Sequence, residues 1–191
     1  MLDWQRKMCF PDTRLPWVMP SPNMPGWETA LVYPGMCLFE ATNISEGRGT
    51  TRPFEIFGAP WLNGWKISEK LNGLKLPGVY FRPLQFQPTF HKFAGEICQG
   101  AFIHLTDREV FKPVLTALAI LRQIQLDYSN HFQWKQPPYE YEHDKLPIDI
   151  LAGTDRIRRM IDNSAQLKEI QEFIEADCAG FDSIRSNYLL Y

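Results

Sequence analysis

The stretch ICQGAFIHLTDREVFKPVLTALAILRQI, residues 97–124, carries the strongest structural signal in the chain. Residues 97–105 are largely apolar and predict a strand, in which Gly100 indicates a bulge or a close backbone approach. Pro113 suits the first position of a helix, and apolar side chains then recur at helical spacing, at Val114, Ala117, Leu118, Leu121 and Ile124. The segment 106–109, Thr-Asp-Arg-Glu, fits a capping box between strand and helix.

Upstream of this stretch the sequence favours strands and loops. Two further apolar runs, Tyr33–Glu40 and Val79–Phe86, predict strands, and Leu62–Leu74 between them predicts a short helix. Residues 1–28 are rich in Pro and Trp, and their prolines exclude a long helix, so we expect an irregular segment there.

Downstream, helical patterns dominate. Residues 136–147 predict a polar loop with several prolines, and Thr154–Ile161 predicts a short helix. Asn163 or Ser164 is expected to cap the next helix, and Phe181–Leu189 is expected to form a last one. The predicted class is therefore α+β: a mixed β-sheet in the first half with helices packed on it, in a single domain over residues 1–191.

Composition narrows the possible functions. The net charge is −2, from 20 basic and 22 acidic residues, which argues against nucleic acid as a partner. No run approaches the roughly 18 apolar residues of a membrane span, and the first residues contain no apolar core of a secretory signal. The four cysteines lack C-x-x-C spacing and no ligand cluster is apparent, so we expect neither a metal nor an organic cofactor.

One polar segment, residues 43–55 (NISEGRGTTRPFE), does not resemble core sequence. Gly47 and Gly49 flank Arg48, whose planar guanidinium matches a carboxylate with two parallel hydrogen bonds. Neighbouring carboxylates and hydroxyls could help to bind a sugar acid or a phosphate; they belong to Glu46, Glu55, Thr50 and Thr51. The alternative is a polar turn in which Glu46 pairs with Arg48 or Arg52, and composition does not decide between the two.

The chain resembles the exo-β-N-acetylmuramidase family over nearly its whole length. The matching blocks are Pro20–Pro25, Thr29–Gly35, Asn43–Thr51, Pro53–Glu55, Gly58–Trp61, Phe81–Pro83, Lys92, Gly95–Glu96, Cys98, Gly100, His104–Arg108, Pro138–Glu142, Pro147–Asp149, Arg185 and Tyr188–Tyr191. Ala41 departs from the family pattern, as do Gly26 and Trp27, and none of these lies in the block from Glu46 to Thr51.

The resemblance implies part of a bacterial glycoside hydrolase that releases terminal N-acetylmuramic acid from peptidoglycan fragments. Family members carry a Rossmann-like half ahead of this region, and the chain resembles the C-terminal domain without that half. The compartment stays open, with the cell envelope or secretion as the expectation. Such hydrolysis uses two carboxyl groups, and Glu46 is favoured as catalytic here because a glycine-rich loop can expose it, ahead of Glu55 and Glu96.

The substrate sugar carries a lactyl carboxylate, for which Arg48 is the expected partner. Asn43, Thr50, Thr51 and Tyr33 complete the expected substrate-binding set, although Tyr33, like Trp61 and Trp65, also suits the core. His104 reads as a core histidine more readily than as a base.

The alternative function is a non-catalytic module that binds muropeptides or docks on a catalytic partner. The implied missing half predicts an exposed apolar face around Trp4, Phe10, Trp17 or Trp27, which could instead pair two copies of the chain as a homodimer.

Overall fold

The computed structural model describes residues 5–190, and its fold is α+β. The strands are β1 (Ile56–Ala59), β2 (Val79–Phe86) and β3 (Cys98–Leu105). The helices are α1 (Trp27–Met36), α2 (Gly64–Gly73), α3 (Pro113–Asp127), α4 (Pro147–Leu151), α5 (Arg156–Asp162) and α6 (Leu167–Arg185), with short 3-10 turns η1 (Phe10–Thr13), η2 (Cys37–Ala41) and η3 (Ser186–Tyr188).

The sheet has the strand order β1-β3-β2, and both pairings are antiparallel, so the expectation of a mixed sheet is wrong. The reason is the connection between β2 and β3, residues 87–97, which is short enough for a hairpin, whereas parallel neighbours need a longer crossover. The predicted strands at 79–86 and 97–105 are confirmed. β1 was not predicted, because its four residues are all buried and show no alternation.

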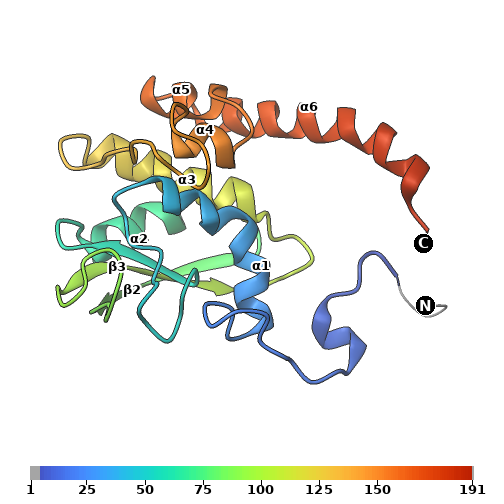
Figure 1. Ribbon diagram of the computed structural model, residues 1–191, viewed down its shortest axis with the longest axis horizontal. Helices are drawn as coiled ribbons and strands as arrows, with labels where there is room; N and C mark the ends of the chain where they lie inside the picture. Colours follow the sequence, from blue (N-terminus) through green and yellow to red (C-terminus); the bar gives the residue numbers. More distant parts are fainter. Residues whose placement is uncertain (1–4, 191) are drawn as a thin grey trace.

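Helices cover one face of this sheet in two layers. In Figure 1, α1, α2 and α3 lie next to the sheet, and α4, α5 and α6 lie beyond α3. The core between sheet and first layer is built from fully buried side chains that include Phe39, Phe57, Phe81, Ile120 and Leu121. The opposite face of β2 and β3 stays partly open to solvent, with Tyr80 51% exposed.

The first predicted strand is wrong: residues 33–40 form the end of α1 and the turn η2. Pro34 and Gly35 read as a turn in the sequence, but α1 continues through both. Gly35 lets α1 approach α3 closely, because a Cβ there would lie 2.1 Å from the carbonyl oxygen of Pro113. Tertiary packing therefore overrides the local signal.

The remaining helix predictions hold with shifted ends. Leu62–Leu74 and Thr154–Ile161 correspond to α2 and α5, and Pro113 is the first residue of α3. The capping box at residues 106–109 is wrong, because no helix starts there; Asp107 Oδ1 instead accepts a hydrogen bond from the Glu109 amide. Gln166, not Asn163 or Ser164, caps α6, and residues 181–185 continue that helix.

Two segments extend away from the body. In Figure 1 residues 5–25 and the last turns of α6 lie toward the same end of the long axis. Phe10 and Trp17 pack edge to face at 4.9 Å, so these rings are partly buried against each other, and Trp27 is also half-buried. Within these two segments the exposed apolar side chains are different ones, and they include Val18, Met19, Phe181, Ile184 and Tyr188. Trp4 lies outside the described residues.

Replacing Gly35 with alanine should lower the free energy of unfolding by about 2 kcal/mol or more, because the new methyl group overlaps backbone of α3. Gly180→Ala is the matched control: it also lies in a helix, nothing lies within 4 Å of a Cβ built there, and it should gain up to ~1 kcal/mol from helix propensity. Urea unfolding measures both; equal effects would contradict the close approach of α1 and α3.

Candidate functional site

The polar segment 43–55 forms a tight loop between η2 and β1. Ser45 and Gly58 exchange two backbone hydrogen bonds, and the Phe54 amide donates to the Glu46 carbonyl oxygen at 2.6 Å. Gly47 and Gly49 both have a φ near +80°, and a Cβ on Gly49 would lie 2.6 Å from the Phe90 carbonyl oxygen. Gly49 therefore allows close packing of this loop on the segment 87–97, and Gly47 allows close packing of the loop on Arg52 and Ile56.

Glu46 is fully buried at the base of the loop, so the expectation that glycines expose it is wrong. Its Oε2 lies 2.8 Å from Lys92 Nζ, and its Oε1 lies 3.3 Å from both Arg48 Nε and His91 Nδ1. The loop folds over the carboxylate because three basic groups from two segments surround it.

Lys92 is the main partner of this carboxylate. Its ammonium group donates to the carbonyl oxygens of Phe39 and Ile44 as well as to Glu46, at 2.8, 3.0 and 2.8 Å. All three of its donors are used, which is what a buried ammonium group requires. Burial lowers the pKa of Lys92, although the Glu46 carboxylate opposes that shift.

Burial also acts to raise the pKa of Glu46, but the contacts with His91 and Lys92 outweigh it and lower the pKa to about 2. Glu46 is therefore ionised at neutral pH and has no proton to give, and its side chain does not reach the surface in this structure. This geometry suits a carboxylate that holds other groups in place.

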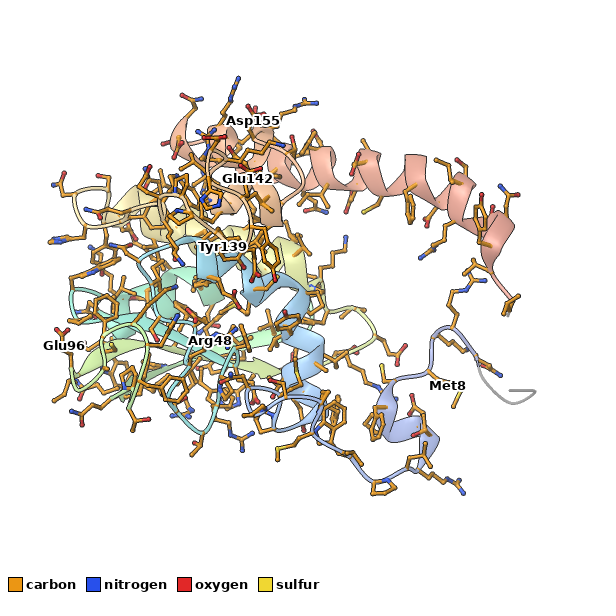
Figure 2. The ribbon with its side chains drawn as sticks, viewed as in Figure 1. Met8, Arg48, Glu96, Tyr139, Glu142 and Asp155 are labelled. Atoms are coloured by element: carbon orange, nitrogen blue, oxygen red, sulfur yellow. The ribbon has the colours of Figure 1, made fainter. Side chains whose placement is uncertain are left out.

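Arg48 lies above Glu46 and is partly exposed, with 26% of its side chain accessible. Its Nη2 donates to Glu40 Oε1 at 2.7 Å, and its Cζ lies 5.0 Å from the centre of the Phe54 ring. The hydroxyl of Tyr139 donates to the other oxygen of Glu40 at 3.0 Å. Figure 2 shows Arg48 and Tyr139 in the centre of the molecule.

The other predicted binding residues do not form one group. Asn43 joins the loop to the segment 131–133: its amide donates to the His131 carbonyl oxygen and accepts from the Gln133 amide. Thr50 closes a turn by donating to the Gly47 carbonyl oxygen, while Thr51 is exposed. Tyr33 is 38% exposed and packs edge to face on Phe54, which places it close to Arg48.

The remaining candidates fall elsewhere. Glu55 is buried and paired with Thr29 and Arg52. Glu96 is exposed at the edge of the molecule, away from Arg48 in Figure 2, and Lys92 pairs with Glu46 rather than with it. Trp65 is exposed, Trp61 stacks on His131, and His104 lies on the half-open face of β3 rather than in the core.

Sequence reasoning assigned no site role to four residues of this cluster, Glu40, His91, Lys92 and Tyr139. Glu40 was assigned to a strand, and neither Tyr139 nor Lys92, at 99 and 46 positions from its partner, carries a local signal for the pairing. The only local hint of a buried role is that Glu40 and Lys92 each lie next to a phenylalanine in the sequence.

Within residues 5–190 no His, Cys, Asp and Glu side chains gather in a group that could hold a metal ion. In the same part of the chain, no helix combines the length and the apolar character needed to cross a membrane.

Comparison with known proteins identifies the family of this chain. Residues 31–191 match the family model described as the C-terminal part of the exo-β-N-acetylmuramidase NamZ. The curated peptidoglycan β-N-acetylmuramidase NamZ of Bacillus subtilis (strain 168) is 44% identical over all 191 residues, which cover 44% of that relative. The chain therefore belongs to the NamZ family, as its C-terminal domain.

Two solved structures share the fold. A DUF1343 family protein from Bacteroides fragilis NCTC 9343 matches with a TM-score of 0.85 and 26% identity, over 98% of this chain and 48% of that one. A second protein of that family and organism matches with a TM-score of 0.58 and 23% identity, over 91% of this chain and 43% of its own length. The chain thus spans about half the length of these relatives.

Glu46 predicts a specific acid sensitivity. Because its pKa is lower in the folded chain, about 2 against 4.5, its contribution to stability is complete above pH ~5 and is lost as the pH falls toward 2. That contribution is roughly 3 kcal/mol at about 1.4 kcal/mol per pH unit.

Glu46→Gln should therefore destabilise the chain at pH 7 and reduce the slope of stability against pH between about 5 and 2. Glu96→Gln, at an exposed site, is the control. Urea unfolding at several pH values measures the slope, and an unchanged slope in Glu46→Gln would contradict the assignment.

Proposed function

We propose that this chain works, together with a preceding half of the kind its relatives carry, as a hydrolase that releases terminal N-acetylmuramic acid from peptidoglycan fragments. The observation that supports this most directly is the 44% identity to a peptidoglycan β-N-acetylmuramidase across the whole chain. The chain covers only part of that relative, so the activity is proposed for the two halves acting together.

In this proposal Arg48 binds the lactyl carboxylate. Glu40 engages Nη2 and Glu46 faces Nε, so Nη1 takes part in neither contact and the guanidinium is held in one orientation. A fixed fork loses little conformational entropy when it binds a planar carboxylate. Tyr33 and Tyr139 lie beside it and offer ring surface and a hydroxyl to the sugar.

Glu46 is proposed as the residue that positions Arg48, with no proton transfer of its own. The role follows from its burial and from its ionised state at neutral pH. The catalytic carboxyl groups that glycoside hydrolysis needs would then include at least one from the preceding half.

Arg48→Lys keeps the charge and removes the fork. In a protein containing both halves it should lower kcat/KM about 10- to 100-fold for a muramic acid glycoside, and much less for the matching glucosaminyl substrate, because only the first carries the carboxylate. Arg159→Lys, at an exposed site paired with Asp155, is the matched control.

An equal loss on both substrates would contradict carboxylate recognition by Arg48. Glu40→Gln provides a second variant: it removes the negative charge that pairs with Nη2 and should reduce the same substrate preference without removing the guanidinium.

The alternative function is a binding or docking module without turnover, and the observation that supports it is an exposed apolar stripe on α6. Ile170 is buried and Phe173 and Ile174 pack on the core, and the same helical stripe continues as Phe181 and Ile184, which are 60% and 57% exposed. The partner proposed for this exposed stripe is the preceding half, since relatives are about twice as long as the chain.

Mixing the chain with the corresponding N-terminal half of the Bacillus subtilis relative tests both readings. Association should weaken at least tenfold in the double variant Phe181→Asp, Ile184→Asp, and remain unchanged in Val110→Asp, at an exposed residue outside the stripe. Hydrolysis of a chromogenic muramic acid glycoside only in the mixture supports a shared site; association without hydrolysis supports the module.

Sedimentation of the chain alone tests a third possibility, that the stripe on α6 forms a homodimer. If the chain forms a dimer that the same double variant disrupts, the stripe pairs two copies and the docking proposal fails.

A further inference from the structure

The half-open face of β2 and β3 carries a second group of basic and aromatic side chains. Tyr80 pairs with His104 and Arg82 pairs with Phe102 across the two strands, so all four point to the same side. The rings of Phe102 and His104 lie 4.2 Å apart. None of these residues contributes to the cluster around Glu46.

Two guanidinium groups lie against one ring here. The Cζ atoms of Arg82 and Arg52 lie 5.6 and 5.9 Å from the centre of the Phe102 ring. The ring attracts both cations without cancelling their charge. Arg52 is also paired with the Glu55 carboxylate, so Arg82 is the guanidinium of this pair whose charge no ion pair offsets within residues 5–190. An anion next to Arg82 would offset this unpaired charge.

Arg82 differs from Arg48 in its partners. Within residues 5–190 no carboxylate forms an ion pair with Arg82, whose Nε donates to His104 Nε2 at 3.1 Å. That hydrogen bond requires an unprotonated Nε2, so His104 is neutral and orients Arg82 without cancelling its charge. The Arg52 guanidinium forms one ion pair, with Glu55 at 3.3 Å, and 55% of its side chain is exposed.

A cavity of about 380 Å³ opens beside these groups. Arg52, Phe102 and His104 line one side, and Trp27, Glu28 and Glu55 line it from α1 and the loop. Its volume suits a small ring compound, and its walls combine aromatic surface with a few convergent polar groups, as in ligand-binding pockets. Carboxylates at Glu28 and Glu55 could accept from hydroxyl or amide groups of such a ligand.

We propose that this face, at Arg52, Arg82, Phe102 and His104, is a binding site for a carboxylate-bearing saccharide fragment. The Arg82 guanidinium, next to the cavity, takes the carboxylate, and the cavity beside Trp27, which Arg52 also lines, takes the ring. The identity of the saccharide as a piece of peptidoglycan rests on the proposed function. The carboxylate can come from the lactyl group of the sugar or from an attached peptide.

The test uses the 191-residue chain and follows the imidazole signals of His104 by NMR. The ligands are N-acetylmuramic acid, with a free lactyl carboxylate, N-acetylmuramyl dipeptide, whose carboxylate lies on the peptide, N-acetylglucosamine, with none, and acetate. At least one muramyl ligand should bind ten times more tightly than N-acetylglucosamine and acetate, and the stronger one identifies the source of the carboxylate.

Burial and the two guanidiniums hold the pKa of His104 below its ordinary value, so a bound carboxylate should raise it measurably. Arg82→Gln and Arg52→Gln should each weaken binding at least fivefold, Arg82→Lys less so, and Arg159→Gln not at all. Circular dichroism verifies that each variant is folded.

Equal binding of N-acetylglucosamine or acetate, no binding by any ligand, or binding insensitive to both glutamine variants would each overturn the proposal. Arg48→Lys separates it from the proposed function: that variant should lower kcat/KM for the muramic acid glycoside about 10- to 100-fold in the two-half protein yet change binding at His104 less than twofold. Loss of hydrolysis alone therefore leaves this site intact, and loss of binding alone leaves the hydrolase proposal intact.

Discussion

The ion pair between Glu46 and Lys92 holds the chain's polar centre together. A largely buried charge is stable only when its hydrogen-bonding capacity is met, and Lys92, 17% of whose side chain is exposed, meets its own by binding two backbone carbonyls along with the Glu46 carboxylate. Those carbonyls belong to η2 and to the loop that follows it, whereas Lys92 comes from the connection between β2 and β3. One ammonium group thus joins three segments, and the orientation of Glu40 and Arg48 above it depends on that junction.

Arg48 and Arg82 differ in whether neighbouring carboxylates balance their charge. Arg48 is supported by the carboxylates of Glu40 and Glu46, so its charge is largely balanced and its orientation is fixed. Arg82 is supported by an aromatic ring and a neutral imidazole, so its orientation is also restricted but its charge is not balanced. A balanced guanidinium discriminates by geometry, and an unbalanced one attracts anions from a greater distance.

The sequence predicted those parts of the fold whose signals are local and periodic. β2, β3 and α3 show alternation or helical spacing over many residues, and the polar loop was recognised from its glycines and charges. Prediction from sequence failed where contacts between distant segments decide the structure. Gly35 suggests a turn in the sequence, but it lies inside α1 because α3 packs against it. Glu46 suggests an exposed carboxylate, but Lys92 and its neighbours bury it. The pairing of Glu46 with Arg48 was one of two readings that the residues allowed, whereas the role of Glu40 required the position of Tyr139.

The projection of α6 beyond the body has a consequence for how the chain exchanges its amide hydrogens with solvent. Its first turns share the core through Ile170, while its last turns rely on their own backbone hydrogen bonds and on surface pairs such as Arg185 with Asp182. Protection should therefore decline along this single helix from residue 170 toward residue 185. A partner bound to the outer turns would make the exchange protection uniform along α6. The exchange profile of this helix therefore shows whether a partner covers that end of the molecule.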